Sequence, residues 1–151
     1  MKKIIFVNLI LVIAFFSSCS KDDENDPRTN YPKKVDVEFS VTSTKNSIYS
    51  TIATSISSGT DENGNTDLDL KETSYSKYHL PFKRIYVAQT VGFFDTLNLS
   101  YADDSITDFT DVFEEYTVEL EIKVDGKIVA SETITIEENG QGTSINYTFL
   151  E

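Results

Sequence analysis

Hydrophobic and polar residues alternate over most of the chain after residue 34. Every second residue between 35 and 41 is Val or Phe, and the residues between them are polar. The same period of two recurs over 48–56, 116–124 and 127–136. Because successive side chains of a strand point to opposite faces, this pattern predicts strands that bury one face.

Turn residues separate these runs and indicate how the strands connect. Asp125-Gly126 lies between two alternating runs, which is the strongest short-range signal for a hairpin. Pro81 interrupts the apolar stretch 78–90, and because proline has no N–H to donate, we expect it at an edge or where a strand changes sheets. Other turns and strands are indicated by Asn63-Gly64, Asn139-Gly140, and the segments 68–70, 93–101 and 143–149.

Residues 104–115 show a different pattern. Ile106, Phe109, Val112 and Phe113 recur at spacings of three and four, which indicates either a short helix over one end of the core or an acidic loop held by its two Phe residues. Seven to eight short strands with at most one helix predict an all-β fold. We expect an antiparallel two-sheet β-sandwich, immunoglobulin-like, that occupies residues 35–151 as one domain.

The amino-terminal residues have the composition of an export signal. Two lysines precede an almost unbroken apolar run over 4–16, followed by small residues. A transmembrane helix needs about 20 apolar residues, so we interpret residues 1–18 as a cleaved signal peptide with Cys19 as the first mature residue.

The segment from Phe16 to Cys19 resembles a bacterial lipoprotein signal. The resemblance implies that the Cys19 thiol takes a diacylglycerol and that its freed amine is acylated. The next five residues are similar to the export tag of Bacteroidota-type surface lipoproteins, which implies an outer-membrane lipoprotein facing outward. A plain secretory signal with an incidental Cys is the alternative. The residues of the tag are Ser20, Lys21, Asp22, Asp23 and Glu24.

Charge and composition limit the partners. The whole chain has 13 basic and 25 acidic residues, and two of the basic ones lie in residues 1–18, so the mature net charge is 11 − 25 = −14. Such a chain is a poor partner for nucleic acid, and its membrane contact should be the lipid. Polar residues with two prolines fill 19–34, which predicts a disordered tether. A solvated surface explains the acidic excess better than a specific cation or a basic partner does.

A second resemblance concerns the domain. The order of Leu80-Pro81-Phe82-Lys83, the strand 118–124, the hairpin 125–129 and the strand 143–149 is similar to the MmpS-type family of small membrane-anchored β-sandwiches. The resemblance implies an accessory to an envelope transporter that carries no catalytic residues.

One acidic segment is spaced like a calcium loop. Oxygen side chains fall at positions 1, 3, 5, 7, 9 and 12 of the window 61–72, as such a loop requires. Thr66 occupies the position that should be Gly, and a turn between strands selects the same residue types. The candidate ligands are Asp61, Asn63, Asn65, Asp67, Asp69 and Glu72.

Catalytic constellations are poorly represented. His79 is the only histidine, Cys19 is the only cysteine, and no Gly-x-Ser-x-Gly segment is present, so nucleophilic templates have no basis. Carboxylate pairs such as Asp103-Asp104 and Glu114-Glu115 are expected by chance in so acidic a chain. We therefore expect a protein that is not an enzyme.

Aromatic residues offer an alternative binding chemistry. Tyr75 and Tyr78 are candidates for stacking on sugar rings, as are Phe93-Phe94, although aromatic residues in strands are usually core residues. The sites around Thr96 and Ser105 resemble acceptor sites for O-glycans. The sequence thus predicts a non-catalytic binding or accessory module for an envelope protein complex, with a surface glycan-binding module as the alternative, and calcium as the one cofactor considered.

Overall fold

A computed structural model describes residues 26–59, 72–106 and 112–150, except for the side chains of residues 72–75. The described chain is almost entirely strand. One short 3-10 helix, η1, precedes the strands. The elements are η1 (Pro27–Asn30), β1 (Lys33–Ser43), β2 (Tyr49–Ser57), β3 (Glu72–His79), β4 (Phe82–Val91), β5 (Thr96–Asp103), β6 (Tyr116–Val124), β7 (Lys127–Ile136) and β8 (Gly142–Thr148).

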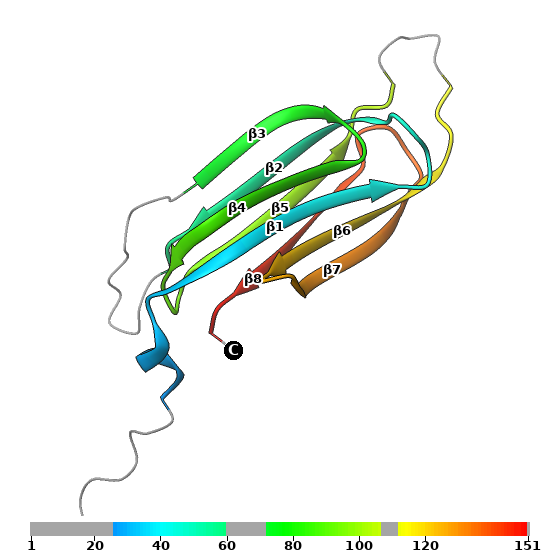
Figure 1. Ribbon diagram of the computed structural model, residues 1–151. Coiled ribbons are helices and arrows are strands. Elements are labelled where there is room, and N and C mark those ends of the chain that lie inside the picture. The colour runs from blue at the N-terminus through cyan, green and yellow to red at the C-terminus, as the bar shows by residue number, and fades with distance from the viewer. Residues whose placement is uncertain (1–25, 60–71, 107–111, 151) are drawn as a thin grey trace, which may run out of the picture.

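The strands form two four-stranded sheets that pack face to face (Figure 1). One sheet has the order β4-β1-β6-β7 and the other has the order β3-β2-β5-β8. Every pair of neighbouring strands is antiparallel. The predicted all-β sandwich of antiparallel strands is therefore confirmed.

The core lies between the two sheets and is built from the alternating positions of the sequence. The inward residues of β1, which are Val35, Val37, Phe39 and Val41, are all buried, as the period of two predicted. Burying a side chain of this size stabilises the fold by about 1.5–3 kcal/mol. The other large buried core residues include Ile52, Ile56, Leu97, Leu99, Val118, Leu120, Ile122, Ile136 and Phe149.

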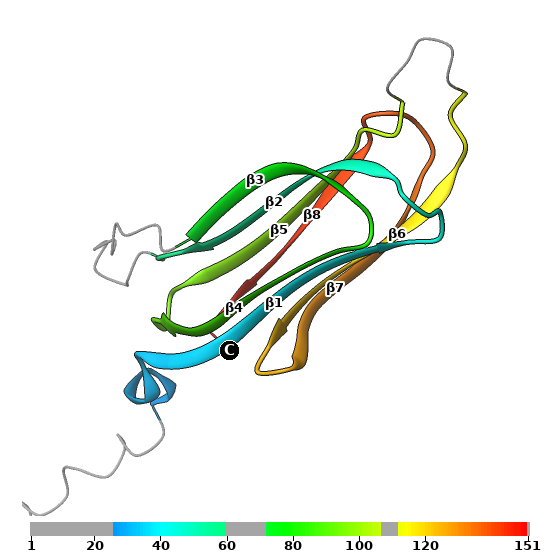
Figure 2. The same ribbon diagram turned by 45° about the horizontal axis from the view of Figure 1, so that its top comes forward.

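Most connections cross from one sheet to the other, as the turned view in Figure 2 shows. Only β2–β3 and β6–β7 are consecutive strands that pair with each other. In the immunoglobulin arrangement the first two strands share a sheet, whereas β1 and β2 lie in different sheets here. The fold therefore shares the two-layer architecture of immunoglobulin domains, but its strands follow a different order within the sheets.

Pro81 lies where the chain changes sheets. β3 ends at His79 in one sheet and β4 begins at Phe82 in the other, so the predicted strand over 78–90 is two strands with a bend between them. Leu80 is buried and anchors this bend in the core. β3 starts at Glu72, earlier than expected, because its mainly polar residues gave no alternating signal.

Three further expectations need correction or fall partly or wholly outside the described residues. The strand predicted over 93–101 begins only at Thr96, because Phe93 and Phe94 form a turn. Residues 104–106 and 112–115 adopt neither helix nor strand, and the rest of that segment is not described. The short strand expected over 68–70 also lies outside the described residues.

The sandwich has two ends that we name by the chain. At the amino-terminal pole β1 begins, β4 turns into β5, and β8 ends; at the distal pole β1 turns into β2 and β3 ends (Figure 1). The expected tether over 19–34 is ordered in its last part, because η1 precedes β1 and Tyr31 packs on Phe149 with 6.2 Å between ring centroids. Among the described residues no helix is long and apolar enough to cross a membrane.

Candidate functional site

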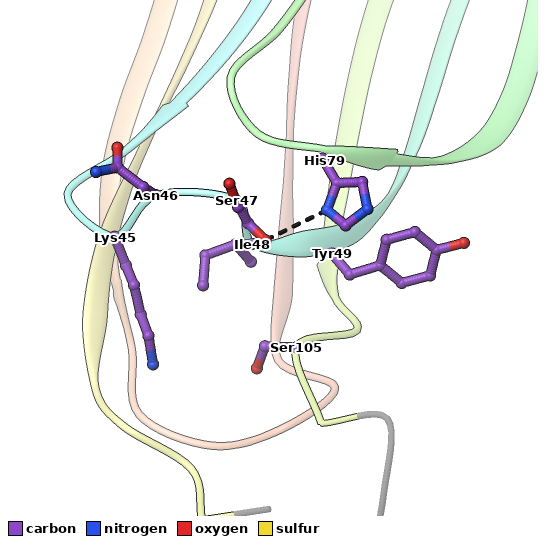
Figure 3. A pocket seen from close by; sticks show the side chains of 7 residues that line it. All are labelled: Lys45, Asn46, Ser47, Ile48, Tyr49, His79 and Ser105. Atoms are coloured by element: carbon purple, nitrogen blue, oxygen red, sulfur yellow. Dashed lines mark hydrogen bonds between the residues drawn. The ribbon is translucent and has the colours of Figure 1, made fainter.

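A hollow of about 580 Å³ opens at the distal pole (Figure 3). Three segments that are distant in sequence surround it: the β1–β2 loop, the end of β3 and the residues after β5. Its lining combines a cation, an amide, hydroxyl groups and two rings, so it suits a polar ligand better than an apolar one. The lining residues are Lys45, Asn46, Ser47, Ile48, Tyr49, His79 and Ser105.

The β1–β2 loop is held in place from both sides. Ser47 has a positive φ of 57°, which lets the chain reverse tightly. Ile48 follows it and is buried, and its carbonyl oxygen accepts a hydrogen bond from the Leu80 N–H at 2.8 Å. The loop that carries the hollow is thus fixed to the bend between β3 and β4.

Two rings lie side by side at the rim of the hollow. The His79 and Tyr49 rings are 4.8 Å apart between centroids and tilted by 50°. His79 Nδ1 lies 3.3 Å from the Ser47 carbonyl oxygen, as the dashed line in Figure 3 marks. The Lys77 ammonium lies 5.6 Å from the centre of the Tyr49 ring, within the range of a cation–π contact.

An ion pair borders the hollow. Lys45 Nζ lies 2.7 Å from a Glu114 carboxylate oxygen, and this hydrogen bond is the main reason that the pKa of Glu114 lies below its usual value. The Glu114 side chain is largely exposed and Lys45 is half-buried, so the pair adds little to stability. Its effect is to bring the segment before β6 against the β1–β2 loop.

Behind the hollow lies a buried polar network centred on Asp103. This side chain is only 2% exposed, and its carboxylate accepts hydrogen bonds from the Tyr116 hydroxyl, from Ser105 N–H at 3.1 Å and from Gly140 N–H at 3.3 Å. The Tyr101 and Tyr116 hydroxyl oxygens are 2.7 Å apart. The one hydroxyl proton of Tyr116 goes to Asp103, so Tyr101 must donate to Tyr116.

The network fixes the loops around Ser105 and Gly140 to the core. Burial raises the pKa of Tyr101 to about 12. The pKa of Tyr116 is also raised, first by burial and then by its hydrogen bond to Asp103. Both phenols therefore stay neutral at physiological pH and serve as donors.

The next residue joins the same loop to the outer face of the second sheet. An Asp104 carboxylate oxygen accepts a hydrogen bond from the Thr51 hydroxyl at 2.5 Å and lies 3.5 Å from Lys77 Nζ. The sequence offered Asp103-Asp104 as a carboxylate pair, and the structure gives the two side chains different surroundings. One is buried with tyrosines and the other is partly exposed.

Of the predicted sugar-stacking pair, only the Tyr78 side chain is described, and it is partly buried against the core. Tyr78 pairs in register with the buried Ser50, and its ring packs on Phe82 at 4.8 Å between centroids. Its hydroxyl also accepts a hydrogen bond from Arg84 at 2.5 Å. Tyr78 is therefore part of the core edge, because its strand position points it between the sheets. Tyr75 pairs in register with Ala53, and its side chain lies outside the described residues.

The remaining predicted sites have different outcomes. Thr96 is partly buried, with its hydroxyl 3.2 Å from that of Thr148, and Ser105 lines the hollow. Glu72 begins β3, but the other five candidate calcium ligands lie outside the described residues, as do Cys19 and the five residues after it. Within the described residues no group of three His, Cys, Asp or Glu side chains is arranged to hold a metal.

Sequence reasoning missed most of the hollow. Lys45, Asn46 and Tyr49 lie in and beside a short turn whose only signal is Asn46-Ser47 between two alternating runs. His79 was considered alone, without the Tyr49 ring that lies beside it. These residues meet only because the β1–β2 loop and the end of β3 share the distal pole.

Comparison with known proteins provides no family for this chain. No protein-family model, no curated protein and no solved structure matches it.

Proposed function

We propose that this chain is an outer-membrane lipoprotein, lipid-anchored through Cys19, whose domain is a non-catalytic binding or accessory module for an envelope protein complex. The proposal is supported mainly by one observation: the start of the described chain and the hollow lie at opposite poles of the sandwich. The described chain begins at Asp26 beside the amino-terminal pole, whereas the hollow opens at the distal pole. An anchor preceding residue 26 would thus leave the hollow accessible to a partner.

The chemistry around the hollow supports binding better than catalysis. Asp103 is committed to three donors. Tyr116, which donates to it, and Tyr101, which contacts Tyr116, have raised pKa values and remain neutral. Lys45 is paired with Glu114. These groups fix loops in position, and a preformed polar surface of this kind favours recognition.

Affinity purification of the lipidated chain from gently solubilised native membranes tests the proposal. Lys45→Ser removes the cation at the hollow, and Lys127→Ser is the matched control because Lys127 is an exposed lysine at the β6–β7 turn. We expect a membrane protein that copurifies with the wild type and the control, but is depleted at least five-fold with Lys45→Ser. Equal recovery with both variants contradicts a role of the hollow. The anchor is tested separately: the wild-type chain should carry lipid and Cys19→Ala should not.

Glycan binding at the hollow is the second candidate function, and the Tyr49–His79 ring pair favours it. A sugar ring needs a flat apolar face with polar groups beside it, and Asn46, Ser47 and Ser105 provide amide and hydroxyl groups there. A glycan at 100 times its Kd stabilises the folded state by about 2.7 kcal/mol, which raises Tm by roughly 5–10 °C. A panel of soluble glycans that leaves Tm unchanged argues against this function.

Calcium is a separate proposal that rests on the spacing of residues 61–72. We expect millimolar calcium to raise Tm relative to a chelator, because a ligand that binds only the folded state stabilises it. An unchanged Tm in the two buffers contradicts a calcium loop.

A further inference from the structure

The turn between β4 and β5 has two phenylalanines at its tip. Asp95 N–H donates to the Gly92 carbonyl at 3.2 Å, and Gly92 N–H donates to an Asp95 carboxylate oxygen at 2.7 Å. These two hydrogen bonds fix a tight turn whose central residues are Phe93 and Phe94. Turn centres usually hold Gly, Pro, Asn, Asp or Ser, so two adjacent Phe residues there need an explanation beyond the turn itself.

The tip is supported from behind and remains partly exposed. A Cβ atom at Gly59 would lie 1.7 Å from the Phe94 carbonyl oxygen, so the chain after β2 already lies directly against the turn. Phe93 and Phe94 are each only partly buried. The turn therefore has no room to fold inward and presents its aromatic surface at the amino-terminal pole.

Other aromatic and apolar side chains join the tip. Tyr31 contacts Phe93 edge-on at 5.4 Å, and Phe93 contacts Phe94 at 5.1 Å between ring centroids. Phe149 is fully buried beneath Tyr31, while Leu150 next to it is 49% exposed. These side chains lie at the amino-terminal pole, and we call them the pole cluster: Tyr31, Phe93, Phe94, Phe149 and Leu150.

A cation accompanies the pole cluster. Lys33 Nζ lies 4.8 Å from the centre of the Tyr31 ring and 5.3 Å from that of Phe149. Aromatic rings accompanied by a lysine are a combination that favours the boundary between lipid head groups and acyl chains. The cluster has this composition although the chain as a whole is acidic, with a net charge of −12.

The chain outside the described residues restricts what can cover this cluster. Six residues lie between Cys19 and Asp26, and the seven steps from one Cα to the next span at most about 25 Å when fully extended. If the lipid is at Cys19, the pole that carries the cluster stays within that distance of the membrane.

We infer that the exposed part of the pole cluster inserts into the phospholipid interface, with Phe94 and Leu150 as its leading side chains, while Phe149 supports it from the core. The sandwich then stands on end, and the hollow at the distal pole faces away from the lipid. This inference rests on the proposed lipid anchor and adds an orientation to it.

Tryptophan fluorescence tests the orientation directly, because the chain contains no tryptophan. Phe94→Trp places a probe in the cluster, and Tyr49→Trp places a matched aromatic probe at the hollow. The full-length lipidated variants are reconstituted in dioleoylphosphatidylcholine vesicles with and without brominated acyl chains. We expect bromine to quench the Phe94→Trp emission at least two-fold and to leave Tyr49→Trp unchanged.

Two controls separate the possible failures. Leu150→Trp probes the same pole at an exposed position, so it serves if the turn variant does not fold. Flotation with the vesicles reports the anchor: lipidated protein should float and Cys19→Ala should not. Lipidated protein that floats while neither pole probe is quenched more than Tyr49→Trp overturns the orientation and leaves the anchor standing. Lipidated protein that does not float overturns both proposals.

Discussion

Replacing Tyr116 with phenylalanine removes one hydroxyl from the centre of the buried network behind the hollow. Asp103 then keeps only its two backbone donors, Ser105 and Gly140, at a position that is 2% exposed. A hydrogen bond to a charged group contributes about 1.5–3 kcal/mol, and the Tyr101 hydroxyl loses its acceptor at a further cost of about 1 kcal/mol. We expect Tyr116→Phe to lower the free energy of unfolding by about 3 kcal/mol.

The neighbouring hydroxyl provides an internal comparison. Tyr101→Phe breaks only the bond to Tyr116 and leaves Asp103 with all three donors, so it should cost about 1 kcal/mol. In the Tyr116→Phe background the same change should cost less than in the wild type, because its partner is already absent. Tyr86→Phe is the control, since its hydroxyl lies 3.4 Å from the Thr54 hydroxyl, at the weak end of the range.

Urea denaturation of the unlipidated Cys19→Ala chain, followed by circular dichroism, measures these differences. With a slope of about 2 kcal/mol per molar urea, Tyr116→Phe should lower the midpoint by about 1.5 M and Tyr101→Phe by about 0.5 M. The reasoning is refuted if Tyr101→Phe costs as much as Tyr116→Phe, because the order of donation along the network predicts the opposite. It is also refuted if Tyr116→Phe costs no more than Tyr86→Phe.

Three further outcomes are expected. The free energy of unfolding should fall as the pH rises from 10 towards 12, by up to about 1.4 kcal/mol per pH unit for each tyrosine. The reason is that the unfolded chain then loses protons that Tyr101 and Tyr116 retain when folded. Urea midpoints measured across this pH range test it. Phe39→Ala should cost about 3–5 kcal/mol by urea denaturation, because Phe39 is fully buried between the sheets. Gly142→Ala should cost about 1–3 kcal/mol or more, because its Cβ would lie 2.3 Å from the Tyr101 carbonyl oxygen; a change below about 0.5 kcal/mol in the urea assay contradicts that close approach.

The strands were predictable where burial is one-sided. Each inward residue of β1 and β6 sits between polar ones, and that alternation follows from a sheet with one face in the core and one in water. β3, an edge strand, gave no such signal over its first half because three of the four residues there, Glu72, Thr73 and Ser74, are polar. Which strands share a sheet was not predictable, since β1 pairs with β4 and β6 across long stretches of chain.

The ordered part of the expected tether shows a second limit of local patterns. Residues 26–32 have the composition of a linker, and composition alone predicted disorder there. Tyr31 instead packs on Phe93 and Phe149 and donates its hydroxyl to the Phe149 carbonyl oxygen at 3.2 Å. A contact between residues 118 positions apart leaves no trace in the local sequence.

The same long-range contacts change what the amino-terminal segment implies. A free tether over 19–34 would let the domain take any orientation above a membrane. Docking of Tyr31 and the start of β1 at Lys33 leave only the residues before 26 as connector, and Tyr31 contacts the aromatic turn at the same pole. Shortening a linker raises the effective concentration of whatever it joins. If Cys19 carries the lipid, weak contacts of the pole cluster with the membrane need only little affinity of their own to orient the hollow away from it.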